Sequence, residues 1–436
     1  MSVERYDVAV VGASIGGCTA ARLFAQRGAR VALIERRPDP AAHKTVCTHY
    51  IQSSATPTIE RLGLAPRLEE RGAVHNSIDL WTRHSGWIGS PPGAPFGYSI
   101  TRRRLDPILR ELAAGTPGVE LHSGWTVSAL HGGDRPRGVE VESPEGQSRR
   151  IDAGLIVAAD GRGSTLARLA GVRARVKPNR RFFYWAYWSG LEPRGPRARM
   201  WFLEPDCAYT FPNEEGLTVG LVAPHEARLA EFRSDREAAY ERMLGALPDG
   251  PVLSGARRES KLLGKLALPN EIRPVARPGL AFVGDAALAG DPFWGIGCGW
   301  AFQSAEWLVD ETAAAVLGGA DLDAALGRYR RLHLRRLAPH HLQMCDFASG
   351  RPANFFERMM WRAAAEDIDV LRTLETLASR RAGPASMLTP GNLLRAFRVS
   401  RRASATGAFA SIGSPEKGGG PNLTHMLEGT LEVQGR

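Results

Sequence analysis

The sequence lacks the features of a membrane-spanning or disulfide-rich protein. It has no uncharged apolar run approaching the roughly 20 residues that a membrane-spanning helix needs, so no membrane span is expected. Its five cysteines are an odd number without regular spacing, which argues against a disulfide framework and predicts a reducing, cytoplasmic compartment. The N-terminal stretch MSVERYDVAVVGAS has no signal-like apolar core, so no secretory signal is expected.

Nucleic-acid-binding motifs are also lacking, although the chain carries a formal net charge of +10 at pH 7. The arginines are scattered as pairs along the whole chain, and no basic helix or zinc finger accompanies them. No nucleic-acid partner is therefore predicted. An anionic cofactor, an acidic substrate or an acidic carrier protein would fit the charge, and a solvated basic surface explains it most simply.

The first residues form a recognisable α/β unit in a chain whose apolar fraction, 43%, is ordinary for a globular protein. Residues 6–12, YDVAVVG, are a continuous β-branched run that predicts a buried strand. Residues 16–28, GGCTAARLFAQRG, have helical spacing and end at a glycine, and residues 29–37, ARVALIERR, predict a second buried strand. This order predicts an α/β fold with a doubly wound sheet.

Farther along the chain, the pattern changes to antiparallel β-structure and then to helix. A buried strand is expected at 154–159. Alternating aromatic segments over 181–265 predict a separate antiparallel sheet with one helix around 234–246. A strand at 279–284 returns to the first sheet, a helix at 299–317 follows it, and the chain then stays helical to about residue 400.

The segment GASIGG, residues 12–17, lies between the first strand and its helix, where a dinucleotide fingerprint belongs. Gly12 allows the tight turn, Gly17 lets the helix pack on the strand, and Ser14 is small enough to keep the approach to the backbone open. Glu35 ends the second strand, where an acidic residue accepts hydrogen bonds from a ribose. The predicted cofactor contacts here are Gly12, Ser14, Ile15, Gly16, Gly17, Glu35 and Arg36.

Two further segments place glycines and acids directly after buried strands. In LIVAADGRGSTLARLAG, an Asp-Gly pair ends a strand with the spacing D-G-x-x-S-x-x-R, which is more specific than a simple turn. In LAFVGDAALAGDPFWGIGCGW, residues 280–300, an acid at the strand end can accept hydrogen bonds from ribitol hydroxyls. The following glycines let a flat ring lie against the backbone, and the next helix directs its positive end there, which indicates an isoalloxazine ring. The predicted contacts are Asp160, Gly161, Arg168, Gly284, Asp285, Pro292, Gly295, Ile296 and Gly297.

Together, the three segments resemble the single-component FAD-dependent monooxygenases of the para-hydroxybenzoate hydroxylase type, over roughly residues 5–330. GASIGG…IERR, DGRGSTLAR and GDAALAGDPFWGIG match the dinucleotide, DG and GD motifs of that family, in the right order and spacing. TRRRLDPILRELA resembles the arginine-led helix of the family, which implies that Arg102 contacts the cofactor phosphates. Leu288 and Gly299 stand where the family has a histidine and an asparagine, and these departures weaken any inference about the substrate.

The resemblance implies a Rossmann-like FAD-binding domain that is interrupted by an antiparallel β-sheet substrate domain and followed by a helical region. The FAD-binding domain is predicted over 1–75, 98–178 and 266–335, the substrate domain over 76–97 and 179–265, the C-terminal helical region over 336–400, and a loosely ordered tail over 401–436. Aromatic residues of the substrate sheet are expected to face an apolar substrate: Trp185, Tyr187, Trp188, Trp201, Phe202 and Tyr209.

The resemblance also implies an activity. FAD would be the resident cofactor, and NAD(P)H would bind transiently as reductant, since no second glycine-rich fingerprint is present. Oxygen would then form a flavin C4a-hydroperoxide that hydroxylates or epoxidises an apolar aromatic or polycyclic small molecule, which is typical of secondary metabolism. Cys47 and His49 are weak candidates for a proton donor or substrate contact. With His43 they lack a fourth ligand, so no metal site is predicted.

Two related activities remain open at this point. Flavin halogenases carry a lysine near the flavin loop, and this chain has Lys44, but its YWAYWSG segment lacks the Ile-Pro of the halogenase motif. The segment CAYTFPNEEGLTVGLV resembles geranylgeranyl-reductase-like enzymes, which saturate a carbon–carbon double bond. The flavin motifs are common to all three classes and do not discriminate between them.

Overall fold

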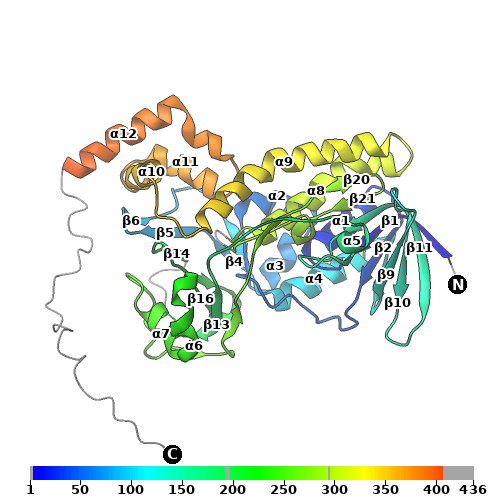
Figure 1. Ribbon diagram of the computed structural model, residues 1–436, viewed down its shortest axis with the longest axis horizontal. Helices are drawn as coiled ribbons and strands as arrows, with labels where there is room; N and C mark the ends of the chain where they lie inside the picture. Colours follow the sequence, from blue (N-terminus) through cyan, green and yellow to red (C-terminus); the bar gives the residue numbers. More distant parts are fainter. Residues whose placement is uncertain (1–2, 192–196, 293–294, 406–436) are drawn as a thin grey trace, which may run out of the picture.

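An eight-stranded sheet forms one half of the computed structural model, which describes residues 3–191, 197–292 and 295–405 (Figure 1). Its main path runs β20-β21-β11-β1-β2-β8, and β10 and β9 extend it from β11. The strands are β1 (Val3–Val11), β2 (Val31–Glu35), β8 (Val119–Ser123), β9 (Thr126–His131), β10 (Gly138–Glu142), β11 (Ser148–Ala158), β20 (Ala276–Arg277) and β21 (Leu280–Phe282).

The central strands of this sheet are parallel and apolar because both of their faces are buried. β1 pairs with β2 and β11 in parallel, and β11 pairs in parallel with β21. After β1, Gly12 has a φ of 103°, a left-handed conformation that favours glycine, and α1 begins three residues later. The main covering helices are α1 (Ile15–Gln26), α4 (Arg102–Ala114), α8 (Gly297–Val316) and α9 (Leu322–Phe347), and α1 packs against α4 and α8.

A second eight-stranded sheet follows the order β17-β13-β16-β15-β14-β5-β6, with β18 paired to β13. It comprises β5 (Ile78–Thr82), β6 (Gly86–Ile88), β13 (Phe183–Ser189), β14 (Ala198–Phe202), β15 (Cys207–Pro212), β16 (Leu217–Ala223), β17 (Arg257–Arg258) and β18 (Leu263–Lys265). Its pairs are antiparallel except that β5 and β14 run parallel. Because β5 and β6 come from an earlier part of the chain, no hairpin turn fixes their direction relative to β14.

Helices and two small sheets complete the described chain. α6 (Leu229–Ser234) and α7 (Arg236–Gly245) lie between β16 and β17, where one helix was predicted. The remaining helices are α2 (Thr56–Arg61), α3 (Ala65–Glu70), α5 (Thr165–Leu169), α10 (Phe355–Glu366), α11 (Ile368–Ala378) and α12 (Pro390–Ala405). The small sheets contain β3 (Tyr50–Ile51), β7 (Gly97–Ser99) and β4 (Val74–Asn76), and β12 (Arg175–Lys177), β19 (Asn270–Ile272) and β22 (Leu288–Ala289).

The predicted fold class is confirmed, with an α/β sheet, a separate β-sheet and helices at the C-terminal end (Figure 1). One detail of the predicted tail is wrong, because α12 continues to Ala405 and residues 401–405 are therefore helical rather than loosely ordered. The rest of that tail, 406–436, lies outside the described residues. Among the described helices, none is both long and apolar enough to cross a membrane.

Replacing Gly17 by alanine tests the close contact between α1 and the end of β1. A Cβ atom at Gly17 would lie 1.7 Å from the carbonyl oxygen of Gly12, so the helix would have to move away from the strand. We expect the free energy of unfolding to fall by about 1–3 kcal/mol, the usual cost of overpacking a core. Urea denaturation measures this change. Gly383→Ala is the control, since a Cβ atom there meets nothing within 4 Å, and equal losses in both variants would contradict the expectation.

Candidate functional site

A cavity of about 530 Å³ lies where β1, β2, β11 and β21 end. Most of the predicted cofactor contacts line it, although they come from segments far apart in the sequence. Those residues are Gly12, Ser14, Ile15, Gly16, Glu35, Arg36, Arg102, Asp160, Gly161, Gly284, Asp285, Pro292, Gly295, Ile296 and Gly297. Gly17 and Arg168 are not lining residues: Gly17 faces the backbone of Gly12, and Arg168 is exposed in the last turn of α5.

Glu35, the last residue of β2, is held as a charged acceptor at the cavity wall. Its carboxylate accepts hydrogen bonds from the backbone N–H of Ala13 at 2.9 Å, from the backbone N–H of Arg37 at 3.1 Å and from Arg37 Nε at 3.0 Å. Burial works to raise the pKa of Glu35, but these hydrogen bonds outweigh it and hold the pKa below its ordinary value. A carboxylate has about four acceptor positions, so Glu35 keeps capacity for a ribose hydroxyl.

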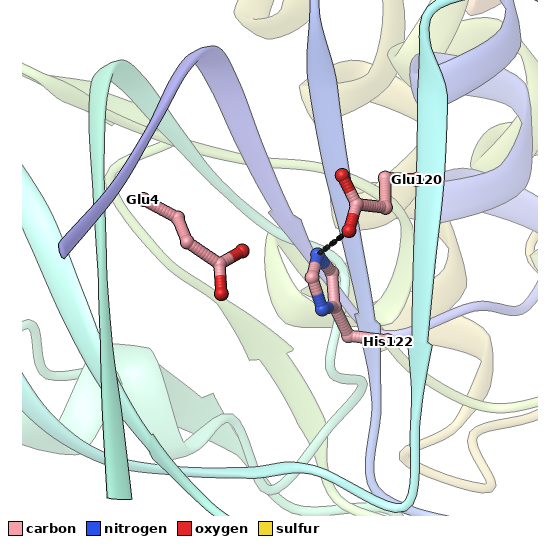
Figure 2. A group of neighbouring side chains, drawn as sticks. All are labelled: Glu4, Glu120 and His122. Carbon is pink, nitrogen blue, oxygen red and sulfur yellow. Dashed lines mark ion pairs between the residues drawn. The ribbon is translucent and has the colours of Figure 1, made fainter. Parts of the chain in front are cut away.

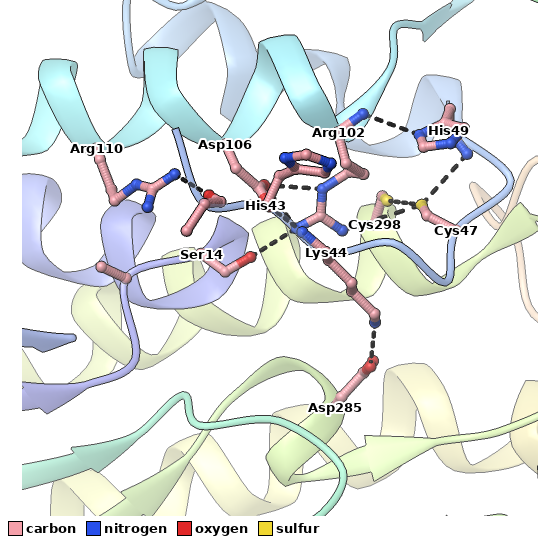
Figure 3. Close-up of polar contacts among 12 residues, drawn as sticks. Ser14, His43, Lys44, Cys47, His49, Arg102, Asp106, Arg110, Asp285 and Cys298 are labelled. Carbon is pink, nitrogen blue, oxygen red and sulfur yellow. Dashed lines mark hydrogen bonds and ion pairs between the residues drawn. The ribbon is translucent and has the colours of Figure 1, made fainter. Parts of the chain in front are cut away.

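Lys44 and Asp285 form an ion pair across the cavity, with 2.6 Å between Nζ and Oδ2 (Figure 3). Burial works to raise the pKa of Asp285, and the Lys44 ammonium overcomes this and lowers it. Burial likewise works to lower the pKa of Lys44, and Asp285 overcomes it and raises that pKa. The backbone N–H of Lys44 donates to Asp106 at 2.9 Å, which fixes the loop after β2 on α4. Both groups are therefore charged at neutral pH.

Arg102 lies at the start of α4 and connects three parts of the site (Figure 3). Its guanidinium donates to Asp106 Oδ1, with 2.8 Å from Nε, and to Ser14 Oγ, with 2.6 Å from its terminal nitrogen. The residue is only 3% exposed, and the charge of Asp106 balances its own. Its positive charge thus lies beside the N-terminus of α1, where backbone N–H groups also attract anions.

Two thiols face each other at the cavity, with 3.6 Å between the Sγ atoms of Cys47 and Cys298. Cys298 lies in the first turn of α8, and the backbone N–H of His49 donates to Cys47 Sγ at 3.2 Å. The hydrogen bond from Cys298 is the largest cause that lowers the pKa of Cys47. Burial opposes it, and the charges of Arg102 and Lys44 add to the lowering. Cys47 is thus the more acidic thiol of the pair, because its pKa is lowered and that of Cys298 is raised.

His49 is turned away from the cavity and is not among its lining residues. Its Nδ1 accepts a hydrogen bond from the backbone N–H of Arg102 at 2.9 Å, and burial lowers the pKa of the ring. In the neutral ring the hydrogen therefore lies on Nε2, which donates to the Tyr187 hydroxyl oxygen at 2.5 Å. Of the two candidates for a proton donor, only Cys47 faces the cavity.

The second sheet supplies an apolar wall to the cavity through Phe183 and Trp185 on β13 and Leu221 on β16. Of the six aromatic residues expected to face a substrate, only Trp185 lines the cavity. Trp188 lies three residues after Trp185 on β13 and packs with Trp201 in a cluster under α7, because alternate residues of a strand point to opposite faces. Tyr187 contacts His49, Phe202 packs on α9 and α10, and Tyr209 is fully buried.

Sequence reasoning missed several residues of the cavity. Phe183 and Leu221 lie on the strands that were expected to face a substrate, but neither was singled out. Cys298 lies between Gly297 and Gly299, the last two of the three glycines of GIGCG, and was not among the predicted contacts. The alternation of side chains along β13 was the one available signal for Phe183, because it shares a face with Trp185.

Away from the cavity, Glu4, Glu120 and His122 place possible metal-ligand atoms within 4.8 Å of one another (Figure 2). These atoms already have partners among the described residues. The Tyr6 hydroxyl lies 2.6 Å from Glu120 and 3.1 Å from Glu4. Arg149 lies 3.6 Å from Glu4. The group is therefore explained as a polar network between the first strands of the sheet.

Replacing Asp285 by asparagine should weaken the binding of FAD, because it removes an acceptor and leaves the Lys44 ammonium without its partner. We expect a loss of about 1–3 kcal/mol in binding free energy. Titration of the apoprotein with FAD, followed by quenching of flavin fluorescence, measures it. Asp323→Asn is the matched control, since it removes a carboxylate from an exposed ion pair with Arg135. Unchanged affinity in Asp285→Asn would show that this carboxylate has no role in cofactor binding.

The thiol of Cys47 should react with iodoacetamide near neutral pH faster than that of Cys207, because burial raises the pKa of Cys207 to about 12. Cys298→Ala removes the hydrogen bond that lowers the Cys47 pKa, so less thiolate is present at pH 7 and the reaction should slow. Peptide mass spectrometry of the apoprotein measures both rates, and added FAD should protect Cys47. Equal rates at Cys47 and Cys207 would contradict the lowered pKa of Cys47.

Comparison with known proteins identifies the family to which the site belongs. The family described as FAD binding domain matches residues 5–238, more than half of the chain. A kynurenine 3-monooxygenase from Salinispora arenicola is 26% identical, over 81% of this chain and 80% of its own. A digeranylgeranylglycerophospholipid reductase from Methanopyrus kandleri is 26% identical, over 74% and 85%. A tryptophan 2-halogenase from Chondromyces crocatus is 27% identical over 75% of this chain, which spans 64% of the halogenase.

Solved structures share the fold at lower sequence identity. A flavin-dependent brominase superposes with a TM-score of 0.76 and 18% identity, covering 92% of this chain and 98% of its own. A p-nitrophenol 4-monooxygenase from Pseudomonas putida superposes with a TM-score of 0.72 and 20% identity, covering 88% and 100%. At these identities, the likeness supports the architecture alone.

The residues of the cavity fit FAD on their own chemistry. Asp160 Oδ1 and Trp300 Nε1 are buried polar atoms of lining residues, and neither has a hydrogen-bond partner among the described residues. The helices α1 and α8 both begin at the cavity, so their positive ends face an anionic or electron-rich ligand. Family match, fold and cavity agree: the chain belongs to the FAD-binding-domain family of flavoprotein monooxygenases and their relatives, and it is an FAD-dependent oxidoreductase.

Proposed function

We propose that this oxidoreductase is a monooxygenase that uses NAD(P)H and O₂ to hydroxylate or epoxidise an apolar aromatic or polycyclic small molecule. The observation that carries the proposal is the apolar wall of Phe183, Trp185 and Leu221, which belongs to the same cavity as the glycine loop at Gly295 and Gly297. Bound FAD supplies hydride acceptance and the activation of oxygen. The wall excludes water from the reacting centre and offers an apolar surface to a substrate.

The residues around the cavity have separate roles in this proposal. Glu35 and Asp285 accept hydrogen bonds from the hydroxyl groups of the cofactor, and Arg102 with the start of α1 attracts its phosphates. The positive end of α8 stabilises negative charge that develops on the ring system. Cys47, the thiol whose pKa is lowered, contacts the cofactor or the substrate. The predicted domain division, the small-molecule partner and the cytoplasmic location belong to the same proposal, and an acidic carrier protein remains an expectation from charge.

The position of Lys44 favours a monooxygenase over a halogenase. A catalytic lysine of a halogenase must present a free amine near the substrate, whereas Lys44 pairs with Asp285 at 2.6 Å, the acid assigned to the cofactor. Most of the reductase-like segment, residues 207–222, lies away from the cavity, and of its residues only Leu221 is in the lining. Tyr209 and Phe211 of β15 stack on each other with ring centroids 5.6 Å apart and are buried in the core. Neither is a lining residue.

Dependence on oxygen and halide separates the three activities. Purified protein containing FAD is mixed with NADH or NADPH and a panel of aromatic and polycyclic compounds, and the compound that accelerates oxidation of the nicotinamide is identified. We expect a product with one added oxygen atom, labelled when the gas is ¹⁸O₂, and no product under anaerobic conditions. Removal of chloride and bromide should have no effect. Lys44→Met should alter cofactor affinity and leave the oxygenated product the same.

A halogenated product that is lost in Lys44→Met would contradict the proposal in favour of a halogenase. Full turnover without oxygen, with saturation of a carbon–carbon double bond, would contradict it in favour of a reductase. Denatured protein with free FAD is the control for uncatalysed oxidation of the nicotinamide.

A further inference from the structure

A second, smaller cavity of about 60 Å³ lies between the second sheet and the C-terminal helices. β5, β6 and α11 supply the aliphatic part of its wall: Ile78, Leu80, Ile88, Leu371, Leu374 and Ala378. Polar residues also belong to the lining: Gln52, Ser53, Ser77, Ser90, Glu375 and Ser379. Figure 1 shows α11 beside the end of the sheet that contains β5 and β6. The proposed mechanism assigns no role to this cavity.

Tyr50 lines both cavities. On one side its ring lies against the glycine loop of the first cavity, since a Cβ atom built at Gly295 would meet Tyr50 Cδ1 at 2.8 Å. The ring also stacks on Phe211, with centroids 5.7 Å apart. On the other side, the charge of Glu375, a lining residue of the second cavity, adds to burial in raising the pKa of the Tyr50 phenol. The side chain of Tyr50 therefore forms the partition between the two cavities.

We propose that the two cavities together bind one substrate, whose reacting ring lies in the first and whose slim apolar tail passes Tyr50 into the second. This inference rests on the proposed function for its premise of an apolar small-molecule substrate, and it adds that the substrate carries an aliphatic chain. The aliphatic side chains of the second cavity suit such a tail because they bury its methylene groups without a polar partner. Tyr50 then contacts the junction between ring and tail and acts as a specificity-determining residue.

A homologous series of ligands tests the proposal without turnover. The oxidised holoenzyme is titrated with para-alkylphenols from para-ethylphenol to para-octylphenol, and the perturbation of flavin absorbance gives each dissociation constant. We expect the dissociation constant to fall by about fourfold for each methylene that enters the second cavity. In Ala378→Trp the indole fills that cavity, so short members should bind as they do to the unmodified protein, and long members should lose the gain.

Arg372→Trp is the matched control, because it places the same indole on the exposed face of α11. The FAD content and urea unfolding of both variants confirm that the fold is retained. Tyr50→Ala is a second variant: it removes the partition, so branched alkylphenols should gain affinity relative to their unbranched isomers.

The proposal is overturned if the series does not bind, if its affinity does not rise with chain length, or if Ala378→Trp and Arg372→Trp show the same dependence on length. Failure of the proposed function is recognised separately. The oxygen and halide experiment could show a halogenase or a reductase while Ala378→Trp still abolishes the chain-length dependence. In that case the proposed function is wrong, and the inference that one ligand occupies both cavities is retained.

Discussion

The parallel pairing of β1 with β2 and β11 is the constraint on which the rest of the molecule depends. Val11 pairs with Ile34 on one side and Ala158 on the other, and Ala158 pairs with Phe282. Parallel strands in register end at one edge of a sheet, so the loops that follow these strands leave from the same place. Reversal of any one strand would carry its glycines or its carboxylate to the opposite edge, and the cavity would lose one of its walls.

Around that edge, two cations of the cavity lining are each paired with a carboxylate. Arg102 pairs with Asp106, and Lys44 pairs with Asp285. Such pairing lowers the cost of holding the charges in a partly buried place, because an unpaired buried charge is strongly destabilising. The Lys44–Asp285 pair also holds the loop after β2 against the loop after β21, and the hydrogen bond from the Lys44 backbone to Asp106 holds the same loop against α4. The parallel sheet therefore positions the strand ends of the site, and the ion pairs fix the loops that follow them.

The parts of the site that could be predicted from sequence are those whose cause is local. Gly12 and Glu35 were predictable because a tight turn and a strand end are properties of a few adjacent residues. The Lys44–Asp285 pair, whose members are 241 residues apart, and the Cys47–Cys298 contact, 251 apart, depend on how whole elements pack. Alternation along β13 separates Trp185 from Trp188, but only the covering helix α7 decides which of the two faces inward. The parallel pairing of β5 with β14 has no signal in either strand.

That pairing has a consequence for how such proteins diversify. The apolar wall of the cavity and the strands β5 and β6 belong to one sheet, yet they come from stretches of chain separated by β8 to β11 of the first sheet. A recombination event with a single crossover would join β14 of one parent to β5 of another, and their side chains would meet without having been selected together. Exchange of the whole sheet between relatives requires two inserted pieces at once. Change at this wall is therefore expected to proceed by point substitution within a lineage rather than by exchange of whole segments. Chimeric proteins built from this chain should take β5, β6 and β14 from the same parent.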